Sequence, residues 1–248
     1  MQSLANYKLD DVATLQGQVQ AALRDSKTLQ EAAQRCAGAI YEGREESLAL
    51  VRVYATVPFS QLPPADRAFA AALAGPGGAA PPLAGDTPVL SLLGTRGGAA
   101  GWNDRRDSEG HLGIPLVASG FVEAIPMVAQ LMHDMGLGLG WLDTRDTQLV
   151  VKTLGRVAGV FYVREAAVRV DARGRKIVPA QDFVRAHNVR TVFGLGGSYL
   201  NGTCLILILF TREIMEREEV ERFLPLVSTI KSLTVGLVMG DALYGRRP

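Results

Sequence analysis

Residues 203–210 read TCLILILF, and residues 224–243 read LPLVSTIKSLTVGLVMGDAL. The first run is short, almost wholly apolar and contains several β-branched residues, which predicts a buried strand. The second run repeats apolar residues at spacings of three and four, which is typical of an amphipathic helix. The polar segment TREIMEREEVERF separates them at residues 211–223. The chain is therefore predicted to close with a buried strand that leads into a long terminal helix.

The segments before this closing unit predict further strands and helices. Apolar, β-branched runs predict strands at residues 48–57, 89–93, 159–163 and 191–195, with a weaker candidate at 135–143. Helical spacing predicts helices at residues 10–41, 65–74, 122–135 and 177–187. Ser26 is the expected cap of a second N-terminal helix, and Asn201-Gly202 predicts a hairpin. Together these elements predict an α+β fold with a central, mainly antiparallel sheet flanked by helices.

The composition narrows the class of protein. Lys and Arg number 26 and Asp and Glu number 25, so a function dominated by nucleic-acid or membrane-surface electrostatics is not expected. Cys36 and Cys204 are too few for a disulfide framework and are expected to be buried free thiols. The N-terminus lacks a signal-peptide pattern, and no apolar run reaches the roughly 18 residues of a membrane span. We therefore expect a cytoplasmic protein without a membrane span.

The order of these elements resembles the GAF family of sensory domains. The residues that carry the resemblance are RTVFGLGGSYLNGTCLILILFTREIMEREEVERFLPLVSTI at 190–230. Several segments look more closely like the GAF-like input module found upstream of bacterial histidine kinases and diguanylate cyclases. They are LALVRVYATVPFSQLPP (48–64), LLGTRGGAAGWNDRRDSEGHLGIPL (92–116), EAIPMVAQLM (123–132), FYVREA (161–166) and IVPAQDFV (177–184).

The resemblance implies one GAF-like sensory domain over residues 1–248, with a core at about 15–243 and an enlarged middle segment at about 75–150. It also implies that the N- and C-terminal helices pack together and often pair with a second copy in a homodimer. The apolar stripe of the C-terminal helix would make this contact with the second copy. It contains Leu226, Ile230, Leu233 and Leu237, with Phe223 and Val227 beside them. A histidine kinase or a cyclase is the partner that this resemblance suggests.

Residues 102–111, WNDRRDSEGH, are the strongest candidate site in the sequence. Guanidinium groups suit a carboxylate or a phosphate, an indole offers a stacking face, and an imidazole changes charge near neutral pH. The other interpretation is a solvated loop whose Asp and Arg side chains pair with each other. The predicted ligand-binding residues, in this segment and the turn before it, are Arg96, Trp102, Asn103, Arg105, Arg106 and His111.

Other motifs give little support for catalysis or for a bound metal. The three histidines, at 111, 133 and 187, lack the spacing of metal ligands, so no metal and no cofactor are predicted. The glycines at 194, 196 and 197 lack the lysine and the following helix of a phosphate loop. No G-x-S-x-G nucleophile motif occurs in the chain.

The favoured function is a non-catalytic sensory domain that binds a small, anionic molecule and signals through the terminal helices of a homodimer. One alternative is a ligand-free interaction platform for a signalling partner. A less favoured alternative is an enzyme that uses residues 102–111 for acid–base chemistry. A concave, partly apolar pocket beside Trp102 favours the sensor, and a filled interior favours the platform. An enzyme requires His111 within hydrogen-bond reach of a carboxylate such as Asp107.

Overall fold

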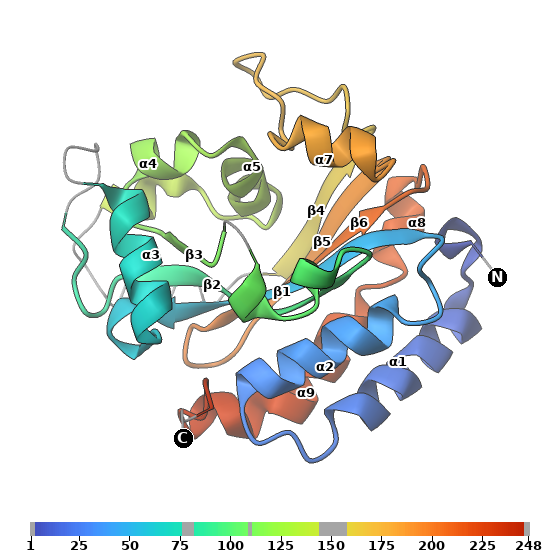
Figure 1. Ribbon diagram of the computed structural model, residues 1–248, viewed down its shortest axis with the longest axis horizontal. Coiled ribbons are helices and arrows are strands. Elements are labelled where there is room, and N and C mark those ends of the chain that lie inside the picture. The colour runs from blue at the N-terminus through green and yellow to red at the C-terminus, as the bar shows by residue number, and fades with distance from the viewer. Residues whose placement is uncertain (1–2, 76–81, 109–110, 144–157, 246–248) are drawn as a thin grey trace.

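The computed structural model describes residues 3–75, 82–108, 111–143 and 158–245. A six-stranded antiparallel sheet runs through the molecule in the order β3-β2-β1-β6-β5-β4 (Figure 1). The strands are β1 (Leu48–Pro58), β2 (Pro88–Gly97), β3 (Gly113–Pro115), β4 (Ala158–Arg164), β5 (Thr191–Ser198) and β6 (Cys204–Thr211). The predicted α+β class and the antiparallel sheet are confirmed.

Helices cover both faces of the sheet. One face carries the terminal helices α1 (Leu9–Leu23), α2 (Leu29–Tyr41) and α9 (Pro225–Met239). The opposite side carries α4 (Ser119–Glu123), α5 (Pro126–Asp134) and α7 (Gln181–Ala186). Helix α3 (Pro64–Ala74) packs at the β3 edge of the sheet, where its Ala70 joins the core beneath the terminal helices. A short helix, α8 (Arg217–Glu221), joins β6 to α9. The architecture is thus GAF-like, with a central antiparallel sheet between two helical layers.

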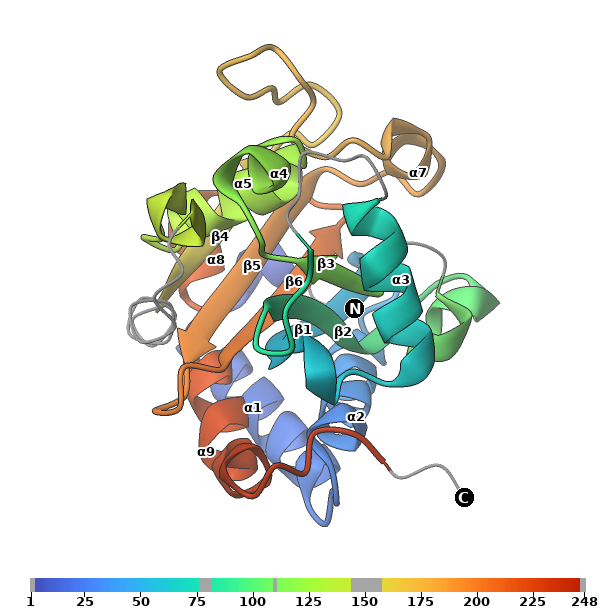
Figure 2. The same cartoon turned by 90° about the vertical axis from the view of Figure 1, so that its left-hand side faces the viewer.

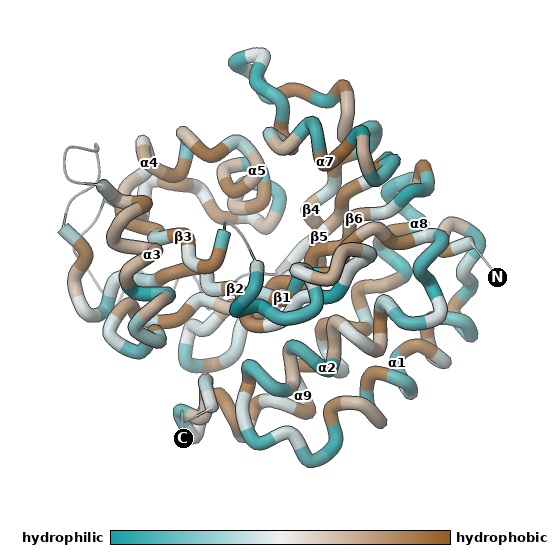
Figure 3. Tube along the Cα trace, in the orientation of Figure 1, coloured by the Kyte–Doolittle hydropathy of each residue, from teal (hydrophilic) through white to brown (hydrophobic). Residues whose placement is uncertain are grey.

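Alternation along the two central strands creates a separate hydrophobic core on each face. In β1, Val51, Val53 and Val57 belong to the core beneath the terminal helices, and Leu50 and Tyr54 belong to the core on the other face. The leucines of β6 face the first core, while its isoleucines face the second. Successive strand side chains point to opposite faces, so one apolar strand supplies both cores. Hydrophobic residues accordingly run along the central strands and recur in bands on the helices (Figure 3).

The terminal helices pack against each other within one chain. Gln16 of α1 donates to Thr229 Oγ1 of α9 at 2.8 Å. The segment after α9 then turns back past α2 (Figure 2). Its carbonyls at Ala242 and Leu243 accept hydrogen bonds from the amides of Leu29 and Gln30, at 2.8 and 2.9 Å. These bonds satisfy two of the free amides that any helix exposes at its N-terminus.

The apolar stripe of α9 mainly covers the chain's own sheet. Leu226, Ile230 and Phe223 are buried, and so is Val227, whereas Leu233 remains exposed. Residues Arg217–Met239 have the length and the apolar composition of a helix that could cross a membrane, and about a third of the apolar window is buried in this structure. Its buried side chains belong to the core beneath the terminal helices.

Two local expectations were wrong. The weak strand predicted at residues 135–143 is instead a turn after α5 followed by a 3-10 helix at Leu139–Asp143. Thr28, not Ser26, caps α2, because its side chain accepts from the amide of Glu31 at 3.1 Å. The hairpin predicted at Asn201-Gly202 is confirmed between β5 and β6, with a five-residue loop at 199–203 in which Gly202 has φ of 85°. Parts of the enlarged middle segment predicted at about 75–150 lie outside the described residues, at 76–81, 109–110 and 144–150.

Candidate ligand-binding site

A cavity of about 480 Å³ opens between the sheet and the helical layer that faces away from the termini. This volume lies within the range that small-molecule sites in proteins usually have. Strands β1 and β6 supply the floor, α5 supplies one wall, and the segment around α7 supplies the other. The lining residues are Leu50, Arg52, Tyr54, Leu90, Trp102, His111, Ile114, Ile125, Met127, Val128, Leu131, Val178, Pro179, Ala180, Phe183, Ile208 and Phe210.

The walls of this pocket are almost entirely apolar. Its floor is made by Leu50 and Tyr54 of β1 and by Ile208 and Phe210 of β6, which point to the same face because they alternate along paired strands. Val128 of α5 closes one side. Pockets with apolar walls and a few convergent polar groups are the usual form of a small-molecule site.

An aromatic cluster forms one rim of the pocket. Trp102 lies in a short 3-10 helix, Ala100–Trp102, and its ring packs edge-on against Phe183 of α7, with centroids 5.3 Å apart. Phe183 in turn packs edge-on against Phe210 of β6 at 5.4 Å. His187 contacts Trp102 from outside the lining, at 4.7 Å. The cluster joins the loop after β2 to α7 across the pocket, so a ligand there would contact both.

Among the described lining residues, Arg52 is the one arginine, and it lies at the apolar floor. Its Nη1 donates to Tyr54 Oη at 3.3 Å, and its Nη2 donates to Ser108 Oγ at 3.1 Å. Its Nε is buried and has no hydrogen-bond partner. No ion pair joins Arg52 to a carboxylate of the described residues. A buried donor without a partner is costly, so Arg52 keeps unused hydrogen-bonding capacity beside the pocket.

His111 stands at the mouth of the same pocket. The residue is exposed there, with backbone in the left-handed region at φ of 57°. Although the residue is exposed, desolvation by the surrounding protein, followed by the positive charge of Arg52, lowers the pKa of His111 below its usual 6.5. The imidazole is therefore neutral at neutral pH and leaves Arg52 as the only full charge among the described lining residues.

The structure brings two of the six predicted ligand residues into this pocket, Trp102 and His111. Arg96 lies on the opposite face, beside α2, where its Nη2 is 3.3 Å from Glu42 Oε1. The Asn103 side chain accepts from the amide of Gly97 at 3.1 Å and so shapes the turn after β2. Ligand binding by any of these residues remains a prediction.

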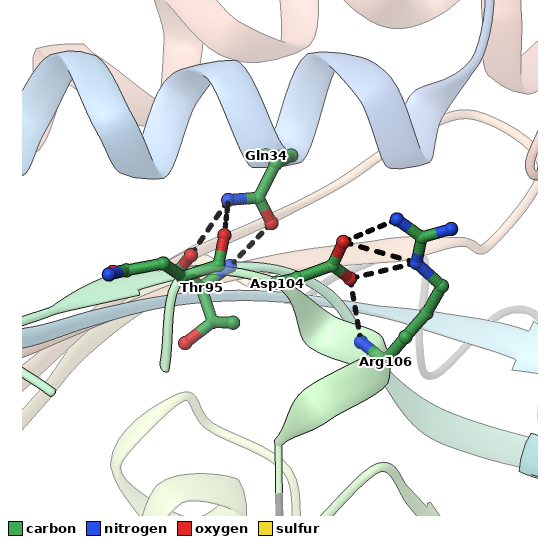
Figure 4. Close-up of polar contacts among 5 residues, drawn as sticks. Gln34, Thr95, Asp104 and Arg106 are labelled. Carbon is green, nitrogen blue, oxygen red and sulfur yellow. Dashed lines mark hydrogen bonds and ion pairs between the residues drawn. The ribbon is translucent and has the colours of Figure 1, made fainter. Parts of the chain in front are cut away.

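The two adjacent arginines of the predicted site are both engaged elsewhere. Arg105 is buried; it donates to the Leu92 carbonyl at 2.6 Å and forms an ion pair with Asp66 of α3. Arg106 is exposed and donates hydrogen bonds to the carboxylate of Asp104, with its Nε 3.0 and 3.1 Å from the two carboxylate oxygens (Figure 4). The hydrogen bond from Arg106 lowers the pKa of Asp104. This second pair matches the alternative interpretation of the segment as a loop that pairs with itself.

Gln34 of α2 connects this region to the terminal helices (Figure 4). Its Nε2 donates to the carbonyls of Thr95 and Asn103, at 2.8 and 3.0 Å, and its Oε1 accepts from the amide of Thr95 at 3.2 Å. Thr95 is the cross-strand partner of Arg52. One side chain of α2 therefore holds the backbone directly opposite Arg52 and the backbone next to Trp102.

The cysteines fit the expectation of buried thiols. Both are buried, and burial raises the pKa of Cys36 to about 12 and that of Cys204 to about 11. Thiols with such values are inert as nucleophiles at neutral pH. Among the described residues, no group of three or more His, Cys, Asp or Glu side chains could hold a metal ion.

Arg52 was missed in the sequence, although a signal for it exists. The run LALVRVYATV contains a single charged residue in an otherwise apolar strand that is buried on both faces. A lone charge in such a strand must either find a partner or serve a ligand, because burying it unpaired is costly.

Comparison with known proteins finds similarity to solved structures but no matching family. No protein-family model matches the chain, and no curated protein matches it. Among solved structures, it is similar to the phycocyanobilin-bound GAF domain from a cyanobacterial phytochrome, at 10% identity and a TM-score of 0.47, over 92% of this chain and 96% of that chain. The phycoerythrobilin-bound GAF domain from a cyanobacterial phytochrome has 10% identity and a TM-score of 0.46, over 95% and 99%.

A third similar structure is the N-acylhomoserine lactone-dependent LuxR-family transcription factor CepR2 from Burkholderia cenocepacia. It has 11% identity and a TM-score of 0.39, over 95% of this chain and 99% of that chain. The first two structures belong to the family that the sequence resembles. At these identities and TM-scores, the groups that those proteins bind remain their own properties, and the GAF-like architecture of this chain rests on its own strands and helices.

Proposed function

We propose that this chain is a non-catalytic, cytoplasmic sensory domain that binds a small anionic molecule in the pocket floored by β1 and β6. The observation that carries the proposal is Arg52, a guanidinium set in apolar walls with a buried Nε that has no partner. Trp102 and His111 would contact the same ligand from the rim. In this proposal Arg96, Asn103, Arg105 and Arg106 shape the scaffold and do not touch the ligand.

An anion is the ligand that best fits the charge of the site. The described part of the lining contains Arg52 and the neutral imidazole of His111 but no carboxylate. Hydroxyl groups of Tyr54 and Ser108 satisfy two donors of Arg52 without neutralising its charge. Charge-assisted hydrogen bonds contribute about 1.5–3 kcal/mol each, so an anion that reached Arg52 would gain affinity from it.

Gln34 supplies a physical route from the pocket to the terminal helices. An anion bound to Arg52 would shift β1 relative to β2, because Thr95 of β2 is the cross-strand partner of Arg52. Gln34 forms hydrogen bonds with both the carbonyl and the amide of Thr95, so a shift of β2 would reach α2. The close approach of α2 to β2 makes this route stiff, since a Cβ on Gly94 would lie 2.3 Å from the backbone of Ala33. Binding changes the helices only if the ligand favours one of their arrangements over another.

The outer face of α9 is the surface that we propose for a homodimer. The described part of α9 carries only one charged residue, Lys231, and four apolar side chains at or just before this helix are exposed: Leu224, Leu233, Val235 and Met239. An exposed apolar helix face often marks an interaction site. A second copy would bury these side chains, and a histidine kinase or a cyclase would be the downstream partner.

A non-catalytic role is supported by what surrounds His111. Among the described residues, no carboxylate acts on its imidazole, whose pKa is set by desolvation and by Arg52, and Asp107 is not a partner. The pocket lining described here also has no Ser, Thr or Cys nucleophile. General acid–base catalysis needs a base within hydrogen-bond reach of the reacting proton and a pKa matched to its task.

The proposal is tested by filling the pocket. Val128→Trp places a bulky ring in the cavity, and Val168→Trp, at an exposed position, is the matched control. Native mass spectrometry of protein purified from cells, with a thermal-shift screen of anionic metabolites, would show bound compounds. We expect binding in the parent and in Val168→Trp but not in Val128→Trp. Binding that ignores Val128→Trp would place the ligand elsewhere and overturn the proposal.

A further inference from the structure

We infer that the ligand of this pocket is an apolar acid with a single negative charge, whose carboxylate binds Arg52, and that phosphate esters are excluded. This inference rests on the proposed function, because it specifies the chemistry of the molecule that the same pocket would take. It is carried by the number of charges in the lining, the free donors of Arg52 and the chemistry of the remaining walls.

The pocket matches one negative charge. Arg52 is the only full positive charge among the described lining residues, since His111 is neutral at neutral pH. A phosphate monoester carries a charge of about −1.5 to −2 at pH 7 and offers three strong acceptor oxygens. Its second charge would enter an apolar cavity without a partner, and an unpaired buried charge is strongly unfavourable.

The free donors of Arg52 also match a carboxylate. A guanidinium has five N–H groups, and the hydroxyls of Tyr54 and Ser108 take one each. Nη2 uses only one of its two hydrogens on Ser108, whereas Nε has no partner, is enclosed by protein and would meet a ligand only after the side chain shifts. Nε and Nη2 form one edge of the guanidinium fork, which is the geometry that binds both oxygens of a carboxylate.

The remaining lining demands an apolar body. The floor contributes Leu50, Ile208 and Phe210, and the helical wall contributes Val128 and Leu131. Burying an apolar group against such walls stabilises a complex by roughly 25 cal/mol per Å² of surface removed from water. A sugar or a polyol would lose hydrogen bonds to water without replacing them here, because the walls offer few polar partners. An aliphatic or aromatic acid satisfies both parts of the site.

Two dyes with one ring skeleton separate the contribution of the charge from that of the cavity. The monoanion 8-anilino-1-naphthalenesulfonate (ANS) and the neutral N-phenyl-1-naphthylamine (NPN) both fluoresce in apolar sites. We expect Arg52→Gln to weaken ANS binding at least tenfold, equivalent to about 1.4 kcal/mol, and to leave NPN binding unchanged. Retained NPN binding also shows that the variant is folded. Arg106→Gln, at an exposed arginine, is the matched control and should change neither.

Three competitors with one chain length then identify the head group. Octanoate, octyl phosphate and octanol differ only in what they present to Arg52, and each would displace ANS from the parent protein at pH 7.5. We expect octanoate to compete at least tenfold better than octyl phosphate or octanol. We also expect this preference for octanoate to disappear in Arg52→Gln when NPN is the displaced dye.

The outcomes separate the two levels of inference. The inferred ligand class is wrong if octyl phosphate competes as well as octanoate. It is also wrong if Arg52→Gln leaves ANS binding unchanged while NPN still binds. In both cases binding of a small molecule in the pocket remains supported. If neither dye binds the parent, or if Val128→Trp leaves both dyes bound, the proposed function itself fails.

Discussion

The ring of Tyr244 lies over the guanidinium of Arg105, with 5.6 Å between Arg105 Cζ and the ring centroid. Tyr244 Oη also donates to Ser91 Oγ of β2 at 2.8 Å. Arg105 belongs to the loop that carries Trp102 and His111, and Tyr244 belongs to the segment after α9. The loop at the pocket and the end of the terminal helix therefore meet at one buried side chain.

The Arg105–Asp66 ion pair should be a major contributor to stability. Both side chains are only 5% exposed, so removing Asp66 leaves a buried, uncompensated guanidinium. We expect Asp66→Ala to lower the free energy of unfolding by about 3–5 kcal/mol, measured by chemical denaturation. Replacing both partners, with Asp66→Leu and Arg105→Met, should recover much of this loss. A loss below 1 kcal/mol for Asp66→Ala would show that the pair is not buried as described.

Gly94 should tolerate no side chain, because of the close approach of α2 to β2. A Cβ there would lie 2.3 Å from the Ala33 carbonyl and 2.6 Å from the Gln34 amide, and neither backbone group can move like a side chain. Gly94→Ala is expected to destabilise the fold by about 3 kcal/mol or more. Gly38 lies in α2, and a Cβ there would make only ordinary van der Waals contact. Gly38→Ala should therefore stabilise the fold by about 0.5–1 kcal/mol. Equal effects in thermal unfolding would contradict this packing.

Gln34→Leu should loosen the link between α2 and the pocket loop. Three hydrogen bonds to Thr95 and Asn103 are lost, at an expected cost of about 1–3 kcal/mol. Amide hydrogen exchange should become faster at residues 95–103. Gln20→Leu, at an exposed position in α1, is the control and should leave that exchange unchanged. Unchanged exchange in Gln34→Leu would contradict the proposal that Gln34 links the pocket to the terminal helices.

His111 should make the fold less stable in mild acid. Its pKa is lowered in the folded protein by burial and by Arg52, so the unfolded chain takes up a proton first as the pH falls below about 6.5. The free energy of unfolding therefore decreases across this window, and His111→Asn should flatten the decrease. His133→Asn, with a ring that is 84% exposed, is the comparison. A pH profile that His111→Asn does not change would contradict this assignment.

The fold was largely predictable because it follows from alternation and spacing. The run at 203–210 is β6, and the amphipathic run that follows contains α9. Residues 135–143 misled the prediction, since alternating Gly and Leu imitate the period of a strand. Glycine contributes no side chain to a sheet face, and this segment packs its Trp141 and Leu142 as a 3-10 helix instead.

The site was only partly predictable, because a cluster of polar residues in sequence is not a cluster in space. Residues 102–111 do reach the pocket through Trp102 and His111, but Arg105 turns inward to Asp66, which lies 39 positions earlier in the chain. That partner has no local signal. Arg52 carried a readable signal as a lone charge in an apolar strand, but its environment required the structure.

Hydrogen exchange with and without a bound probe tests the central claim most directly. Peptides that span the pocket, α2 and α9 would be followed in the parent protein with saturating ANS, and in Val128→Trp as the control for binding outside the cavity. The account predicts slower exchange in the pocket peptides and altered exchange in α2 and α9, all absent from Val128→Trp. Protection confined to the pocket, with α2 and α9 unchanged, would contradict a sensor that signals through its terminal helices.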